Sequence, residues 1–136
     1  VYLTAYVALV RLGRLAPGEW VLVHGATGGV GLAAVDLARA LGAKVIATSR
    51  SAAKLAVVER EHRPDAALPA PGFREHVNEL TDGRGADVVF DPVGGDVFDE
   101  STRCIDFDGR LLVGGDAVEP LFSAGRALAF SSKPVA

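Results

Sequence analysis

The glycine-rich turn at residues 25–31 is the part of this chain whose residue types most clearly indicate chemistry. It holds four glycines and follows an apolar, β-branched segment, Trp20–His24, that favours a buried strand. The run from about Val30 to Leu41 then favours a helix. Glycine lets the backbone adopt positive φ and approach a ligand closely, and the N-terminus of a helix favours an anion. The pattern predicts a pyrophosphate site; a turn that only packs helix on strand is the alternative.

The end of the second predicted strand, Lys44–Thr48, decides which nucleotide such a site accepts, because it lies beside the ribose. A site for NAD usually has an acid there, yet no Asp or Glu occurs between Asp36 and Glu59. Two hydroxyls and two cations occur instead, which are the donors that a 2′-phosphate needs: Ser49, Arg50, Ser51 and Lys54. The sequence therefore predicts NADPH as the cofactor. The alternative is that the two cations are ordinary solvated residues at the start of a helix.

Composition and charge argue against several other classes of function. A net charge of −3 and the lack of a basic stripe with interleaved aromatics disfavour nucleic acid as a partner. The single cysteine, Cys104, excludes an internal disulfide framework and a thiolate zinc site of its own, so no metal ligands are predicted. We expect Cys104 to be a small core residue on a helix. No membrane span or signal peptide is visible, which predicts a cytoplasmic protein without a membrane partner.

No catalytic residues are predicted. Neither Tyr2 nor Tyr6 has a lysine four residues later, which excludes the catalytic pair of short-chain dehydrogenases. The glycine turn lacks the Lys-Ser/Thr ending of a P-loop. His24 lies at the end of a buried strand, where a hydrogen-bonded structural histidine is expected. A binding site without a catalytic constellation suits hydride transfer, in which the cofactor carries the chemistry.

Periodicity predicts helices that alternate with strands along the chain. The predicted helices are Leu3–Leu12, Val30–Leu41, Ala52–Glu61, Phe73–Leu80 and Asp96–Ile105, and the predicted strands are Trp20–His24, Lys44–Thr48, Ala66–Leu68, Ala86–Asp91 and Arg110–Gly114. Such alternation predicts one α/β domain over residues 1–136: a Rossmann-type, doubly wound parallel sheet in three α/β/α layers, with strand order 3-2-1-4-5. A turn is expected at Asp108-Gly109, and a truncated sixth strand at Ser132–Ala136.

Ligands of such a sheet bind at the carboxyl ends of its strands. The loops Asp91–Gly95 and Gly114–Ala117 follow the fourth and fifth predicted strands, so both are expected at that edge. Asp91 has two interpretations, as a ligand contact or as a turn residue that accepts hydrogen bonds from nearby N–H groups.

The chain resembles the medium-chain dehydrogenase/reductase superfamily, and within it the zinc-independent NADPH:quinone oxidoreductases (zeta-crystallin-like). The matching segments cover most of the chain: Thr4–Leu9, Pro17–Gly31, Leu41–Thr48, Leu80–Val89, Asp91–Gly95 and Gly109–Val113. The resemblance implies the cofactor-binding domain of a larger enzyme, with a GroES-like catalytic domain outside this chain. It further implies reduction of a quinone or an α,β-unsaturated carbonyl, a homodimeric full-length protein, and an inactive isolated fragment. A start in mid-helix without Met likewise suggests a piece of a longer protein.

The resemblance also assigns residues to parts of the cofactor. It places Thr27, Gly28, Gly29 and Val30 at the pyrophosphate, Ser49, Arg50, Ser51 and Lys54 around the 2′-phosphate, and Thr4 and Gly115 near the nicotinamide. Gly25 and Gly31 complete the predicted site.

Three other functions are compatible with parts of this pattern. Enoylreductase domains of polyketide synthases share much of it and are the nearest enzymatic alternative. A standalone, non-catalytic nucleotide-binding redox sensor is an alternative of another class. A methyltransferase that uses S-adenosylmethionine shares the glycine turn but usually keeps an acid after the second strand, so its absence disfavours that class.

Overall fold

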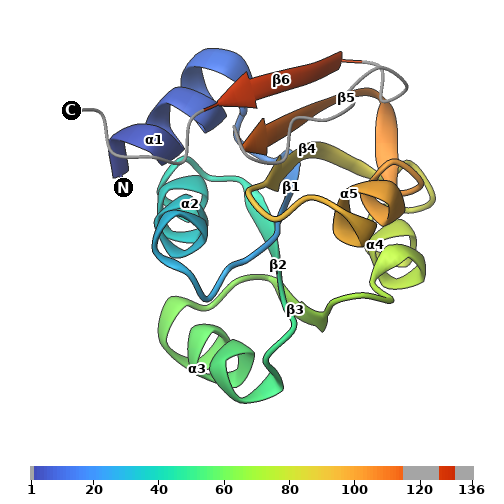
Figure 1. The fold of residues 1–136 in the computed structure, drawn as a ribbon. Helices are drawn as coiled ribbons and strands as arrows, with labels where there is room; N and C mark the ends of the chain where they lie inside the picture. The colour runs from blue at the N-terminus through green and yellow to red at the C-terminus, as the bar shows by residue number, and fades with distance from the viewer. Residues whose placement is uncertain (1, 115–125, 131–136) are drawn as a thin grey trace.

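A six-stranded parallel sheet forms the centre of the chain. The computed structural model describes residues 2–114, and of residues 126–130 the backbone alone (Figure 1). The strand order is β3-β2-β1-β4-β5-β6, and every neighbouring pair is parallel. The strands are β1 Trp20–Val23, β2 Lys44–Ser49, β3 Ala66–Pro69, β4 Ala86–Asp91, β5 Ile105–Gly114 and β6 Arg126–Phe130. The predicted fold class and the order 3-2-1-4-5 are confirmed, and β6 extends the sheet beyond β5.

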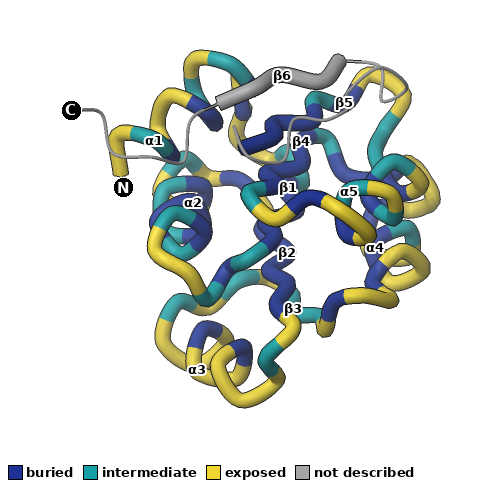
Figure 2. Tube along the Cα trace, viewed as in Figure 1, coloured by how far each residue is buried: buried dark blue, intermediate teal, exposed yellow. Residues whose placement is uncertain are grey.

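Helices cover both faces of the sheet and make a three-layer arrangement (Figure 1). They are α1 Tyr2–Tyr6, the π-helix η1 Val7–Leu12, α2 Gly29–Ala40, α3 Ala52–His62, α4 Arg74–Leu80 and α5 Asp96–Ser101. One buried cluster joins Val21 and Val23 of β1 to α1, η1, α2 and α3, and a second joins Leu22 to α4 and α5. Because both faces are covered, the central strands are mostly apolar on both sides and are buried over most of their length (Figure 2).

The region around the start of β5 differs from the sequence prediction. Helix α5 ends at Ser101, so Ile105 belongs to the strand and not to the helix. The predicted turn at Asp108-Gly109 lies inside β5, where the register shifts: Ala86 pairs with Ile105, but Val88 pairs with Arg110. The extra residues of β5 bulge away from β4, and Phe107 among them is 99% exposed. A bulge of this kind depends on pairing with β4, which periodicity along one strand does not reveal.

Two smaller predictions also need correction. The first helix has the predicted extent, but its second half is π-helical, and Gly13 donates its N–H to Ala8 O at 2.8 Å. Cys104 is a buried core residue as expected, but it lies in the connection after α5 and not on the helix. The segment Ser132–Ala136, predicted as a truncated last strand, lies outside the described residues. None of the described helices has the length and apolar character needed to cross a membrane.

Candidate functional site

The turn after β1 is fastened to both neighbouring strands at the carboxyl edge of the sheet. His24 donates its backbone N–H to Phe90 O of β4 at 2.9 Å, and Ala26 donates to Thr48 O of β2 at 3.0 Å. The glycine turn therefore begins at a fixed position between β2 and β4. The sheet order 2-1-4 makes this edge the place where the ends of three strands converge.

Two glycines allow this turn to pass directly into α2. Gly25 has a φ of +58°, which side chains disfavour. A β-carbon on Gly31 would lie 2.1 Å from Gly25 O, so the helix packs against the turn with only hydrogen between them. Gly31 thus has a packing role in this turn, and its place in the cofactor site stays a prediction.

Gly28 has a different environment. It precedes α2 in an extended conformation, and a β-carbon there would meet protein only at 3.5 Å, at Gly25 O. No side chain caps the start of α2, and its first turn contains no acid. This open backbone at the N-terminus of a twelve-residue helix fits the predicted pyrophosphate position, where N–H groups and the helix dipole favour an anion.

The structure brings three of the predicted hydroxyl residues together beside this turn. Thr27 Oγ1 lies 3.2 Å from Ser49 Oγ at the end of β2. Ser49 Oγ also accepts the backbone N–H of Ser51 at 3.1 Å, and Ser51 Oγ caps α3 by accepting the N–H of Lys54 at 3.3 Å. These bonds connect the glycine turn to the start of α3, as expected for one polar site that reaches from the pyrophosphate to the ribose.

The two predicted cations, in contrast, lie in different surroundings. Arg50 lines a cavity of about 180 Å³, whereas Lys54 lines another, of about 250 Å³, together with Thr27. Arg50 forms an ion pair with Asp96, the first residue of α5. Sequence reasoning missed Asp96 as a neighbour. The predicted strand order contains the signal, because it places the loop after β4 only two strands from the end of β2.

The cavity beside Arg50 is walled by the ends of β1 and β2, the residue after β3, and the loop and helix after β4. Its lining residues are His24, Gly25, Thr48, Ser49, Arg50, Ala70, Val93 and Val97. Of these, Gly25, Ser49 and Arg50 were predicted as site residues. The other lining residues were not predicted as site residues, and the small apolar side chains among them, Ala70, Val93 and Val97, belong to no motif that would indicate a site.

His24 forms part of this wall as a neutral, fully buried residue. Its Nδ1 lies 2.7 Å from Thr48 Oγ1 and its Nε2 lies 2.6 Å from Ser101 Oγ. Ser101 donates its one hydroxyl proton to Val97 O, so Nε2–H donates to Ser101 and Nδ1 accepts from Thr48. Burial lowers the pKa of His24 to about 3. The prediction of a structural, hydrogen-bonded histidine is confirmed.

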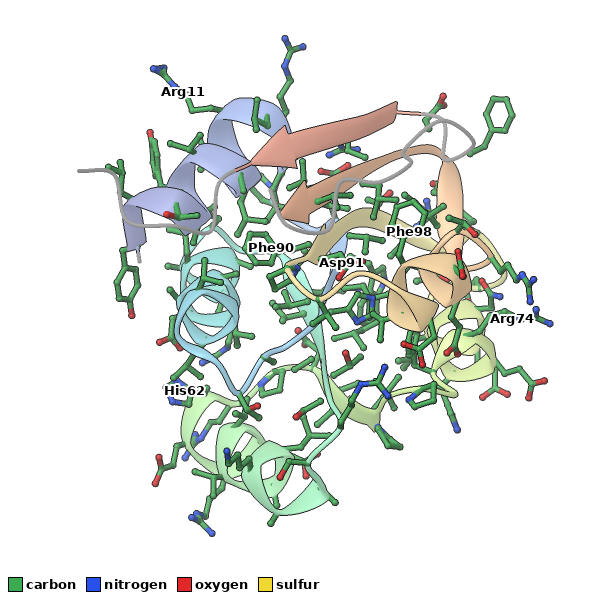
Figure 3. All side chains as sticks on the ribbon, viewed as in Figure 1. Arg11, His62, Arg74, Phe90, Asp91 and Phe98 are labelled. Carbon is green, nitrogen blue, oxygen red and sulfur yellow. The ribbon has the colours of Figure 1, made fainter. Side chains whose placement is uncertain are left out.

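Asp91 is the last residue of β4 (Figure 3). Its Oδ1 accepts the backbone N–H groups of Val93 and Gly94, both at 2.8 Å. Its Oδ2 is buried and has no hydrogen-bond partner in the described structure. Burial raises the pKa of this carboxyl, although the two N–H groups act in the opposite direction. The turn interpretation of Asp91 is the one that these contacts support.

The sequence profile of the zinc-binding dehydrogenase family matches residues 29–134, well over half of the chain. The chain belongs to this family and to the medium-chain dehydrogenase/reductase superfamily. Among the described residues, no three His, Cys, Asp or Glu side chains gather closely enough to hold a metal. The glycine turn and the hydroxyl residues after β2 both lie at the edge where a doubly wound sheet binds a dinucleotide.

Curated relatives of this dehydrogenase domain include two kinds of larger protein. The quinone oxidoreductase-like protein 2 homolog of Nematostella vectensis is 42% identical over 117 residues, which is 85% of this chain and 32% of that protein. A phenolphthiocerol/phthiocerol polyketide synthase of Mycobacterium tuberculosis is 40% identical over 114 residues, 82% of this chain and 5% of that protein. The domain thus spans only a minor part of either relative.

Solved structures show the same relationship. A probable oxidoreductase from Mycobacterium abscessus superposes with a TM-score of 0.82 at 40% identity, covering 97% of this chain and 41% of that one. The nucleotide-binding subdomain of the enoylreductase domain of PpsC from Mycobacterium tuberculosis superposes with a TM-score of 0.81 at 33% identity. The match covers 94% of this chain and 76% of that one. The chain corresponds to the cofactor-binding domain of the medium-chain dehydrogenase/reductase superfamily, as its resemblance to the family implied.

Of the two residues predicted near the nicotinamide, only Thr4 lies within the described structure. Thr4 lies on α1, half-buried. Gly115 lies outside the described residues. Their assignment remains a prediction.

Proposed function

We propose that this domain binds NADPH for an oxidoreductase that reduces a quinone or another α,β-unsaturated carbonyl. The observation that carries the proposal is the end of β2, whose own residues include no acid. Ser49 there contacts Thr27, just before the uncapped N-terminus of α2, and Arg50 and Ser51 follow it directly. In this proposal the backbone at Gly28, Gly29 and Val30 holds the pyrophosphate, and the residues after β2 hold the 2′-phosphate. Lys54, on the other side of Thr27, adds positive charge at longer range.

The bound nicotinamide supplies the hydride, so the domain needs no catalytic side chain of its own. The residues of this chain bind and orient the cofactor. In the proposal, substrate contacts come from a GroES-like domain without a zinc site, located outside this chain, and the full-length protein is a cytoplasmic homodimer.

A second candidate is the enoylreductase step of a polyketide synthase. The specific observation in its favour is the 40% identity to a polyketide synthase and the structural match to an enoylreductase subdomain. Both candidates accept a hydride from the nicotinamide on a conjugated, electron-poor carbonyl compound, and both require the same cofactor site. The full-length enzyme distinguishes them by its preference for a quinone or for a thioester-linked enoyl substrate.

A nucleotide titration tests the cofactor proposal directly. The double variant Arg50→Ala/Lys54→Ala is expected to lose about 1–3 kcal/mol of NADPH binding, because charge-assisted hydrogen bonds are lost, and to leave NADH binding nearly unchanged. The matched control, Arg60→Ala/Arg74→Ala, removes the same charge from exposed positions on α3 and α4. Equal losses for both nucleotides would overturn the assignment of the 2′-phosphate site.

A further inference from the structure

The ion pair between Arg50 and Asp96 joins two loops at the carboxyl edge of the sheet. Arg50 follows β2, and Asp96 begins α5 on the far side of β1. Asp96 Oδ1, the oxygen that contacts Arg50, also accepts the backbone N–H of Val97 at 3.0 Å. The carboxylate is therefore held in place by its own helix while it contacts the arginine.

This ion pair lies at the rim of the cavity described above. Arg50 and Val97, the residue next to Asp96, both line the cavity, together with Gly25 and Ser49. Arg50 is the strongest candidate for binding a 2′-phosphate, so the carboxylate of Asp96 occupies the same donor group that the phosphate would need. No other ion pair of Arg50 exists within the described part of the chain.

We propose that Asp96 is a specificity-determining residue, whose carboxylate competes with the 2′-phosphate for Arg50 and so narrows the preference for NADPH over NADH. This inference rests on the proposed function, since it requires a phosphate at Arg50. In this proposal the site has an acid near the ribose, and that acid comes from the start of α5 in place of the end of β2. Asp96 acts through Arg50 and through repulsion of the phosphate.

The expected effect is moderate, because the pair is open to solvent. The side chains of Arg50 and Asp96 are 55% and 58% exposed. Exposed ion pairs are weak, so a phosphate with two charges and several acceptor oxygens displaces the carboxylate. Asp96 therefore lowers the affinity for the phosphate without preventing binding.

Two small probes isolate the 2′-phosphate from the rest of the cofactor. They are 2′,5′-ADP and 5′-AMP, which differ only in that group, titrated calorimetrically into the chain. Asp96→Asn keeps an acceptor for the N–H of Val97 and removes the charge. It should bind 2′,5′-ADP about threefold to tenfold more tightly than the wild type and 5′-AMP within about twofold. Asp96→Ser provides a second neutral variant.

The control is Asp99→Asn on the same short helix, since Asp99 is exposed and its carboxylate has no ion pair among the described residues. It should leave both affinities unchanged. In the background of Arg50→Ala, the gain from Asp96→Asn should shrink, because part of it depends on the arginine.

The outcomes separate this inference from the proposed function. If Arg50→Ala leaves the ratio of the two affinities unchanged, or if the wild type binds neither probe, the NADPH site is misplaced and both proposals fail. If Arg50→Ala lowers that ratio but both neutral variants at Asp96 leave it at the wild-type value, only the role of Asp96 is overturned. A gain of the same size in Asp99→Asn would also overturn it, since the effect would then be general electrostatics.

Discussion

The carbonyl oxygen of Gly25 lies 2.1 Å from the position that a β-carbon on Gly31 would take. Any side chain at Gly31 must push the first turn of α2 away from the loop that follows β1. That loop is fastened to β2 and β4 by backbone hydrogen bonds, so it cannot move without disturbing both strands. Gly31 thus sets the distance between α2 and the sheet, and with it the position of the helix N-terminus.

This contrast between two glycines gives a first prediction. Gly31→Ala should lower the free energy of unfolding by about 2–3 kcal/mol, because overpacking of this site requires a backbone shift. Gly28→Ala should change stability by less than about 0.5 kcal/mol, because its φ of −90° suits any residue and the space around it is open. Urea unfolding measures both.

The same two variants report on the ligand. If the pyrophosphate binds over Gly28, the alanine variant should fold normally and still lose at least about tenfold in affinity for NADPH, since its β-carbon occupies the path of the ligand. A Gly28→Ala chain that binds NADPH as the wild type does would place the pyrophosphate elsewhere.

Arg50 and Lys54 should contribute unequally to the recognition of the 2′-phosphate. The sequence predicts both cations at the 2′-phosphate. In the structure, however, they line different cavities, and of the two only Arg50 shares its cavity with Ser49 and Gly25. We expect Arg50→Ala to weaken NADPH binding by about 1–2 kcal/mol and Lys54→Ala by less than about 0.5 kcal/mol. Titration of each single variant with NADPH and NADH checks this. A larger loss for Lys54→Ala would assign the phosphate to the cavity beside Thr27.

Local pattern was sufficient for the order of the first five strands and for the glycine turn. The strands β1, β2 and β4 each contain a short run of buried apolar residues, and the helices between them begin and end at recognisable residues, such as Ser51 at the start of α3. With parallel connections, these elements leave few possible strand orders. The hydroxyls after β2 could be assigned to the site because they follow a strand end directly.

Pairing between distant residues explains what local pattern missed. The bulge in β5 exists because Val88 pairs with Arg110, and nothing within residues 105–114 specifies that register. Asp96 lies near Arg50 because β2 and β4 both pair with β1, so the segments that follow these two strands lie at the same edge of the sheet. Ser101 completes the hydrogen bonds of His24 from 77 residues away. Each of these contacts depends on tertiary geometry that a single sequence does not encode in any short motif.

The buried His24 predicts that the domain loses stability in acid. Burial lowers its pKa to about 3 in the folded chain, against an ordinary value of 6.5. Below pH 6.5 the unfolded chain therefore binds a proton that the folded chain does not. Stability should fall by about 1.4 kcal/mol per pH unit from this residue alone as the pH drops from 6.5 towards 3. His24→Gln should remove this slope, whereas His76→Gln, at an exposed site, should keep it.

Asp91 predicts the opposite dependence on pH, again through burial. Its pKa is raised above the ordinary value of 3.8, so the folded chain binds a proton more readily than the unfolded chain. The contribution of Asp91 to stability is then fully present below pH 3.8 and is lost as the pH rises through the raised pKa. Asp91→Asn cannot ionise and should lack this loss.

This dependence on pH is tested by measuring the free energy of unfolding of the wild type and of Asp91→Asn at pH 7 and at pH 3.5. Relative to the variant, the wild type should be more stable at the lower pH, and the effect of His24 cancels because both chains contain it. Asp91→Leu should lose about 1–3 kcal/mol at both pH values, since the N–H groups of Val93 and Gly94 lose their acceptor. A constant difference between wild type and Asp91→Asn across this range would show that Asp91 titrates like a solvated carboxyl, which requires its Oδ2 to be hydrated or hydrogen-bonded in solution.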